Sequence, residues 1–293
     1  MANLQPVTQH QGEDIRLEVF GRTLAAKRWG DPHGPKCLAL HGWLDNANTF
    51  DRLAPQLPEL NLVALDFAGH GYSDHRPAGA HYHQIDDVQD VIAAAQVLGW
   101  DRFSLIGHSM GAQVSAEVSC LFPGKVERCV LIDGMLATGQ LEMHERVEQT
   151  REGLTKMLTS HIKPKVFNDV DAMAERVTQA TDQSFAAARA LVERGHTIVE
   201  GGVTWCTDPR IRYPSPLRPS REYIDELLTH CEVASLLIVA NQGDEWYRSE
   251  VSHITSTHPK LEVQYMDGPH HIHLEPEYVN EVVAKTRTYL GLA

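Results

Sequence analysis

The sequence has few of the features that mark secreted, disulfide-linked or membrane proteins. Its cysteines are odd in number and show no C-x-x-C spacing, which favours free thiols in a reducing compartment. No stretch approaches the roughly 20 consecutive apolar residues of a membrane span, and the N-terminus lacks the apolar run of a secretory signal. These absences predict a cytoplasmic protein that does not bind membranes.

Positive charge is also scarce. The 293 residues carry 26 Lys and Arg against 39 Asp and Glu, a formal net charge of −13, and the basic residues form no block. Nucleic acids are therefore not expected as partners, because phosphate binding needs concentrated positive charge. The 17 histidines are densest at 81–83 and 270–273, without the cysteine or carboxylate spacing of a zinc site. We expect neither a metal nor another cofactor.

The sequence does contain a series of short apolar segments separated by helical patterns. Two alternating segments at 14–20 and 23–29 indicate an opening hairpin. Six further segments end mostly in Gly, Asp or His and are typical of strands buried on both faces: 36–42, 61–67, 103–109, 127–134, 235–244 and 261–268. Strand and helix in alternation predict an α/β fold with a mostly parallel, doubly wound sheet of about eight strands.

The alternation breaks between residues 135 and 220. Two long helix-like segments, 140–162 and 171–195, are followed by a proline-dense run, DPRIRYPSPLRPS. We expect residues 1–134 and 221–293 to form the core, and residues 135–220 to form a helical lid inserted after the sixth strand. An ordinary helical subdomain would give the same pattern.

The segment FSLIGHSMGA at 103–112 is the first candidate for chemistry, because ligands bind beyond the carboxyl ends of parallel strands. It matches G-x-S-x-G around Ser109, directly after a strand and before a helix. A nucleophile elbow needs this context, since its serine occupies a strained turn and the glycines let strand and helix approach. A serine that only caps the helix is the alternative interpretation.

A nucleophilic serine needs a base to take its proton and an acid to hold that base. The last strand leads into GPHHIHLEP, which offers His270 and His271 as bases. Asp244 ends the preceding strand and is the preferred acid. The order Ser109, Asp244, His270 is the order of the triad in α/β hydrolases.

Four motifs in this order, LHGWLDNANTFDRL, ALDFAGHGYSD, LIGHSMGA and GPHHIHLEP, resemble the α/β-hydrolase superfamily and most closely its serine hydrolase-like protein family. The resemblance runs over nearly the whole chain. It implies that Ser109 is the nucleophile and that the backbone N–H groups of Trp43 and Met110 form the oxyanion hole. Near the second motif and the HGW loop, Asp66 and Asp45 are expected to shape loops rather than to react.

The resemblance also bears on the remaining alternatives. The histidine motif of the family, G-x-H-x-x-H, favours His270 over His271. Some members of the superfamily place the acid one strand earlier, which leaves Asp133 in VLIDGML as the alternative to Asp244.

These features predict a serine hydrolase of the carboxylesterase type that acts on a small or medium hydrophobic acyl substrate. A thioesterase, a lactonase or a carbon–carbon bond hydrolase would use the same residues. A small-molecule sensor with the same fold and little turnover is an alternative of a different class. The sequence does not indicate an oligomeric state.

Overall fold

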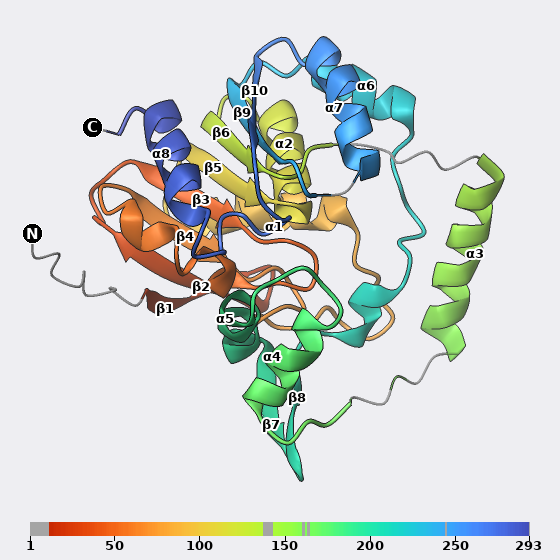
Figure 1. Cartoon of the computed structure of the whole chain (residues 1–293). Coiled ribbons are helices and arrows are strands. Elements are labelled where there is room, and N and C mark those ends of the chain that lie inside the picture. Colours follow the sequence, from red (N-terminus) through yellow and green to blue (C-terminus); the bar gives the residue numbers. More distant parts are fainter. Residues whose placement is uncertain (1–11, 137–142, 160–161, 163–164, 244, 293) are drawn as a thin grey trace, which may run out of the picture.

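The computed structural model describes residues 12–136, 143–159, 162, 165–243 and 245–292. In the described residues, eight strands form one sheet in the order β1-β2-β4-β3-β5-β6-β9-β10 (Figure 1). The strands are β1 (Glu13–Val19), β2 (Arg22–Gly30), β3 (Lys36–Leu40), β4 (Asn61–Leu65), β5 (Phe103–His108), β6 (Val126–Ile132), β9 (Ser235–Ala240) and β10 (Leu261–Met266). β2 pairs antiparallel with β1 and β4, and the other pairings are parallel. The predicted hairpin and the mostly parallel sheet are confirmed.

Two hydrophobic cores cover the two faces of this sheet. In β3, Leu38 and Leu40 point into one core and Cys37 and Ala39 into the other, as the two-residue period of a strand requires. The first core is completed by α1 (Gln84–Val97), α2 (Met110–Leu121), α6 (Arg221–Thr229) and α7 (Glu245–Thr257), and the second by α8 (Val279–Leu290) with the short 3-10 helices η1 (Ala47–Phe50) and η2 (Ala54–Gln56). Burial on both faces explains why the segments of β3, β4, β5, β6 and β9 are largely apolar. The same expectation is wrong for β10, which lies at the edge of the sheet and is only partly buried.

The chain between β6 and β9 leaves the sheet. It contains α3 (Met143–Thr159), α4 (Val170–Thr178), α5 (Phe185–Gly195), a separate hairpin of β7 (His196–Val199) and β8 (Gly202–Trp205), and the 3-10 helix η3 (Pro209–Arg212). Figure 1 shows α4, α5 and the hairpin grouped together, whereas α3 stands apart from them. No described helix is both long enough and apolar enough to cross a membrane.

Two details of this region differ from the expectation of a purely helical insertion. The segment 171–195 is not one helix, because Ser184 begins α5 by accepting a hydrogen bond from the backbone N–H of Ala187. The hairpin after α5 was not predicted. Gly201 and Gly202 have φ angles of +87° and +146°, which glycine adopts more readily than other residues, and they form the turn of the hairpin. The strands on either side of this turn contain β-branched residues, which favour strands.

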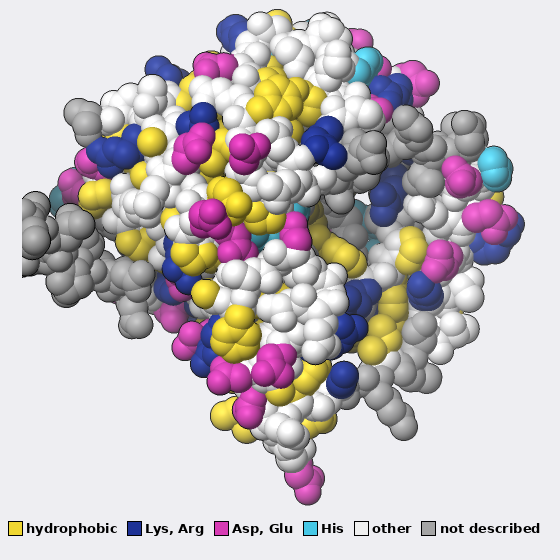
Figure 2. Space-filling model, in the orientation of Figure 1, with side chains coloured by type: hydrophobic (Ala, Val, Ile, Leu, Met, Phe, Trp, Pro, Cys, Tyr) yellow, Lys and Arg dark blue, Asp and Glu magenta, His cyan; other side chains and the backbone are white. Residues whose placement is uncertain are grey.

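α3 packs against the proline-dense run. The Thr150 hydroxyl donates to the carbonyl of Pro216 at 3.2 Å, and Arg146 donates to the carbonyl of Pro219 at 2.9 Å. A Cβ atom on Gly153 would lie 2.2 Å from the carbonyl oxygen of Pro214, so only glycine allows this approach. Figure 2 shows this side of the molecule, with a hollow between α3 and the body of the protein.

A buried ion pair joins the β6–β9 region to the sheet. Arg194 on α5 donates from Nε to Asp66 Oδ2 at 2.8 Å, and both side chains are almost completely buried. Asp66 follows β4 and also accepts from the backbone N–H groups of Ala47 and Tyr72. The expectation that Asp66 organises the turn after its strand is confirmed by these contacts.

We expect Arg194→Met to lower the free energy of unfolding by about 3 kcal/mol, because it leaves the Asp66 carboxylate buried without its cation. Urea unfolding followed by circular dichroism measures this loss. Arg189→Met is the matched control, because Arg189 lies on the same helix but forms partly exposed ion pairs with Asp171 and Glu193. Its loss should stay below about 1 kcal/mol. Equal losses in the two variants would contradict a structural role for the buried pair.

Candidate active site

Ser109 occupies the tight turn that joins β5 to α2. Its φ and ψ angles are +51° and −116°, a strained backbone conformation for a residue other than glycine. The flanking glycines make the turn possible, since a Cβ atom on Gly107 would lie 2.4 Å from the carbonyl oxygen of Gly111, and one on Gly111 would lie 2.0 Å from that of Leu40. The side chain of Ser109 makes no capping hydrogen bond to α2. The capping alternative is therefore wrong.

Asp133 directly follows β6 and lies beside this turn. Its φ angle is +44°, and its side chain is 2% exposed. The carboxylate accepts from the backbone N–H of Ala240 through Oδ1 at 2.9 Å, and Oδ2 lies 2.5 Å from Nδ1 of His270. A Cβ atom on the next residue, Gly134, would lie 2.4 Å from the carbonyl oxygen of Ser109. The backbone after Asp133 is thus packed directly on the backbone of Ser109.

The two candidate histidines have different surroundings. His270 is 28% exposed in its side chain and contacts Asp133, the residue that the sequence offered as the alternative acid. His271 is 10% exposed, and its Nε2 lies 2.8 Å from the Gln183 amide nitrogen and 3.2 Å from Oδ2 of Asp45. Asp244, the preferred acid, lies outside the described residues.

The HGW loop follows β3 and is held by two buried histidines. Nδ1 of His41 donates to the carbonyl of Gly42, and its Nε2 accepts from the N–H of Phe67. His70 accepts from the N–H of Leu44 through Nε2 at 3.3 Å. Trp43, between these anchored positions, is 51% exposed. Both histidines thus hold this loop through hydrogen bonds to the backbone.

Asp45 connects this loop to His108, which precedes Ser109, and to the loop that carries His271. Its Oδ2 lies 3.2 Å from Nε2 of His271 and 3.5 Å from Nδ1 of His108. Burial raises the pKa of Asp45, but the neighbouring His271 and His108 more than offset this effect and hold it well below its usual value. Asp45 is therefore a carboxylate at neutral pH.

These three side chains also have the spacing of metal ligands. The ligating atoms of Asp45, His108 and His271 lie within 4.8 Å of one another, and all three residues are buried. Within the described ranges, this is where a metal ion could be held. The hydrogen bonds of Asp45 and His271 give the group a structural use of its own, because they tie three loops together.

Burial lowers the pKa of several histidines around the site. The pKa of His70 and that of His108 fall to about 3, and those of His41 and His273 are also lowered, with burial as the first cause in each. A neutral His108 donates from Nε2 to the carbonyl of His270 at 3.1 Å, since a carbonyl can only accept. Neutral imidazoles thus position the backbone around Ser109.

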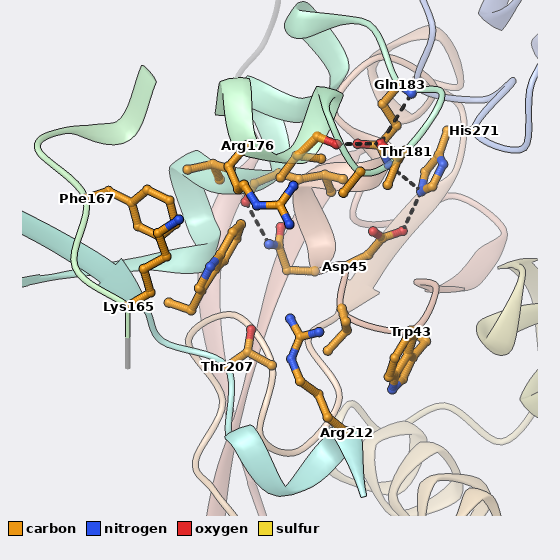
Figure 3. Close-up of a pocket in the computed structure, with 17 residues that line it drawn as sticks. Trp43, Asp45, Lys165, Phe167, Arg176, Thr181, Gln183, Thr207, Arg212 and His271 are labelled. Carbon is orange, nitrogen blue, oxygen red and sulfur yellow. Dashed lines mark hydrogen bonds and ion pairs between the residues drawn. The ribbon is translucent and has the colours of Figure 1, made fainter. Parts of the chain in front are cut away.

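Two cavities adjoin the site, and Trp43 lines both. The Ser109 cavity, of about 420 Å³, contains Ser109 and Met110 with apolar side chains that include Leu136, Ile211 and Ile224. The second cavity, of about 470 Å³, is lined by Asp45 and His271 together with residues of the β6–β9 region (Figure 3). No sequence pattern predicted this second cavity, because its walls come from segments far apart in the chain.

We expect stability to fall as the pH decreases from 6.5 toward 3. An unfolded chain protonates His70 and His108 near their ordinary pKa of 6.5, whereas the folded chain accepts these protons only near pH 3. The contribution of these two histidines to the free energy of unfolding is complete above their unfolded-chain pKa of 6.5 and is lost as the pH falls toward their folded-state pKa of about 3. Urea unfolding at about pH 7, 6 and 5 should show that the free energy of unfolding decreases as the pH falls. In His70→Gln the number of protons taken up on unfolding, which sets this slope, should be smaller by about one. His230→Gln, at an exposed position, is the control, and an unchanged slope in His70→Gln would contradict the assignment.

The geometry agrees with similarities to known proteins. Residues 38–276 match the model of the family described as alpha/beta hydrolase fold. A serine hydrolase-like protein of Danio rerio is 33% identical over 290 residues, which cover 92% of this chain and 86% of that protein. Serine hydrolase-like protein 2 of Homo sapiens is 31% identical over 290 residues, covering 92% of each.

Solved structures give the same result. A hypothetical protein of Pseudomonas aeruginosa PAO1 has a TM-score of 0.89 and is 38% identical, covering 96% of this chain and all of the other. The thioesterase domain from the curacin biosynthetic pathway has a TM-score of 0.82 at 24% identity, over 94% of this chain and 98% of that domain, which supports the fold alone. The chain belongs to the α/β-hydrolase fold family and, within it, to the serine hydrolase-like proteins.

Proposed function

We propose that the protein is a serine hydrolase that cleaves carboxylic esters, with Ser109 as nucleophile, His270 as base and Asp133 as acid. The observation that carries this proposal is the 2.5 Å contact between Nδ1 of His270 and Oδ2 of Asp133, next to the strained turn of Ser109. The similarity to serine hydrolase-like proteins supports the same conclusion.

The tautomer of His270 follows from this contact. The Asp133 carboxylate accepts the proton on Nδ1, which leaves Nε2 unprotonated and able to take the proton of the Ser109 hydroxyl. Ser109 Oγ then bonds to the ester carbonyl carbon, and the imidazolium returns its proton to the departing alcohol. Water attacks the acyl-enzyme with His270 again as base, which releases the carboxylic acid and restores Ser109.

The backbone N–H groups of Trp43 and Met110 are the proposed oxyanion hole. Neither N–H has a hydrogen-bond acceptor among the described residues, so both are available to a ligand. Such preorganised donors are typically worth about 2.7 to 4 kcal/mol each in the transition state. The contacts of His41 and His70 to the HGW loop provide the rigidity that this role needs.

Asp133 replaces Asp244 as our preferred acid. The sequence favoured Asp244 because it ends its segment directly, but the described contact to His270 is made by Asp133. Gly243 supports this choice, because a Cβ atom there would lie 2.5 Å from Oδ2 of Asp133. The end of β9 therefore leaves room for the carboxylate of β6.

The Ser109 cavity suggests the acyl group. Its apolar side chains favour a small or medium hydrophobic acyl chain, and Ile211, Tyr213 and Leu217 contribute to it from the β6–β9 region. We propose that this region, residues 135–220, serves as a lid. An ester is the simplest substrate for these residues and requires no cofactor. A lipase of Mycobacterium tuberculosis is 30% identical over 158 residues, about half of either chain.

We expect Ser109→Ala to lower kcat for p-nitrophenyl butyrate by about 10⁶-fold, to the level of the assay background. A fluorophosphonate probe should label wild-type protein on the peptide that contains Ser109 and should not label the variant. Turnover that survives in Ser109→Ala would overturn the mechanism. Saturable binding of the ester by wild-type protein without turnover or labelling would instead support the sensor alternative.

Separate substitution of the two carboxylates tests the acid. Asp133→Asn should lower kcat on the order of 10⁴-fold, because an amide cannot hold the Nδ1–H tautomer of His270 or stabilise its imidazolium. Asp244→Asn is the matched control and should change kcat by less than about tenfold. Thermal unfolding of each variant separates loss of folding from loss of activity. A large loss confined to Asp244→Asn would restore the sequence-based assignment.

A further inference from the structure

The cavity in Figure 3 combines an apolar lining with basic side chains. Its apolar part comes from aromatic and aliphatic residues on several elements: Trp43, Phe167, Leu191, Val192 and Trp205. Three cations stand around it: Lys165, Arg176 at the end of α4, and Arg212 at the end of η3. An apolar body with an anionic group would match both parts of the lining.

The two arginines face each other. In Figure 3 the guanidinium groups of Arg176 and Arg212 extend into the cavity from opposite walls. Neither forms an ion pair with a carboxylate in the described part of the chain, and Arg212 instead lies 6.0 Å from the centre of the Trp43 ring. Two like charges in the wall of one cavity repel each other, and a carboxylate between them would reduce that repulsion and accept hydrogen bonds from both guanidinium groups.

The acidic residue in the same wall does not neutralise these cations. Asp45 lines the cavity, but its Oδ2 is held by His271 at 3.2 Å and lies 3.5 Å from His108. Elsewhere in this region arginine is paired, as Arg194 is with Asp66 and Arg189 with Asp171. Arg176 and Arg212 are both exposed, and in a chain with a net charge of −13 they bring two guanidinium groups without a carboxylate partner among the described residues to the wall of one cavity.

The cavity is also placed to act on the reaction. Trp43 lines both this cavity and the Ser109 cavity, and its N–H is one of the proposed oxyanion donors. His271, directly after the proposed base, lies in the same wall. A molecule bound here would therefore contact Trp43, which also lines the cavity of Ser109.

We propose that this cavity binds a carboxylate of the substrate through Arg176 and Arg212, so that the enzyme prefers esters carrying a second, negatively charged carboxyl group. This inference rests on the proposed hydrolase function. Each guanidinium offers two parallel donors to a planar carboxylate, and Trp43, Phe167 and Trp205 cover the apolar chain that carries it.

Matched pairs of esters test the preference. In one series, mono-p-nitrophenyl esters of dicarboxylic acids of increasing length are compared with neutral p-nitrophenyl esters of the same length, which places the carboxylate on the acyl side. In the other, 4-butyryloxybenzoate is compared with phenyl butyrate, which places it on the leaving group. Wild-type protein should favour the anionic member, by kcat/KM, in at least one series. The series that responds identifies the part of the substrate in this cavity.

Substitution of the arginines then tests the assignment. Arg176→Gln and Arg212→Gln should each lower the ratio of kcat/KM for the anionic over the neutral ester by about tenfold, as expected for loss of one charge-assisted contact. Arg176→Lys should keep part of the preference. Arg189→Gln, outside the cavity, is the control and should leave the ratio unchanged. A wild-type enzyme without preference, or the same loss in Arg189→Gln, would overturn the inference.

A binding measurement separates this inference from the proposed function. Ser109→Ala protein is titrated with glutarate monophenyl ester, and tryptophan fluorescence reports occupancy because Trp43 and Trp205 line the cavity. Binding should weaken about tenfold when Arg212→Gln is added. Binding without turnover by wild-type protein would reject the hydrolase proposal and keep the carboxylate site. Turnover of neutral esters without carboxylate-dependent binding would reject the site and keep the hydrolase.

Discussion

The backbone turn at Ser109 constrains most of the surrounding structure. A positive φ angle at a serine is sustained only because neighbouring backbone packs against it on several sides. Gly107 and Gly111 allow β5, α2 and the end of β3 to meet, and Gly134 lets the end of β6 lie on the serine itself. The positions of the strands that carry the other candidate residues are therefore fixed by the same contacts that hold Ser109. The geometry of the site thus depends on the packing of the sheet.

Around this turn, the loops are fixed by buried polar groups that keep a single protonation state. His41, His70 and His108 are neutral, because burial lowers their pKa values. The ring of each histidine forms hydrogen bonds with the backbone of another segment. Asp45 and Asp66 remain as carboxylates with several donors each. Imidazole suits this task because one ring nitrogen donates while the other accepts. These three histidines thus serve to position loops around the site.

The sequence was sufficient to predict those features of the protein that depend on residues close together in the chain. The fold follows from apolar strands and helical spacing, and Ser109 from five consecutive residues in a strand–turn–helix context. The sequence favoured Asp244 over Asp133 as the acid on weak grounds, because β6 and β9 are neighbours in the sheet and a carboxylate at either end reaches the same edge. The contact of Asp45 with His271 joins residues 226 positions apart, and the facing of Arg176 and Arg212 depends on how α4 and η3 pack. No local pattern encodes such distances.

An acid at the end of β6 has a structural consequence for the region that follows it. Asp133 is the last residue before the chain leaves the sheet, yet its carboxylate is held from the other side, by the N–H of Ala240 and by the space above Gly243. The backbone of Gly134 is in turn fixed against Ser109. The proposed triad is thereby anchored in the core before the β6–β9 region begins. That region in turn contributes Gln183, which contacts His271, and side chains that line both cavities.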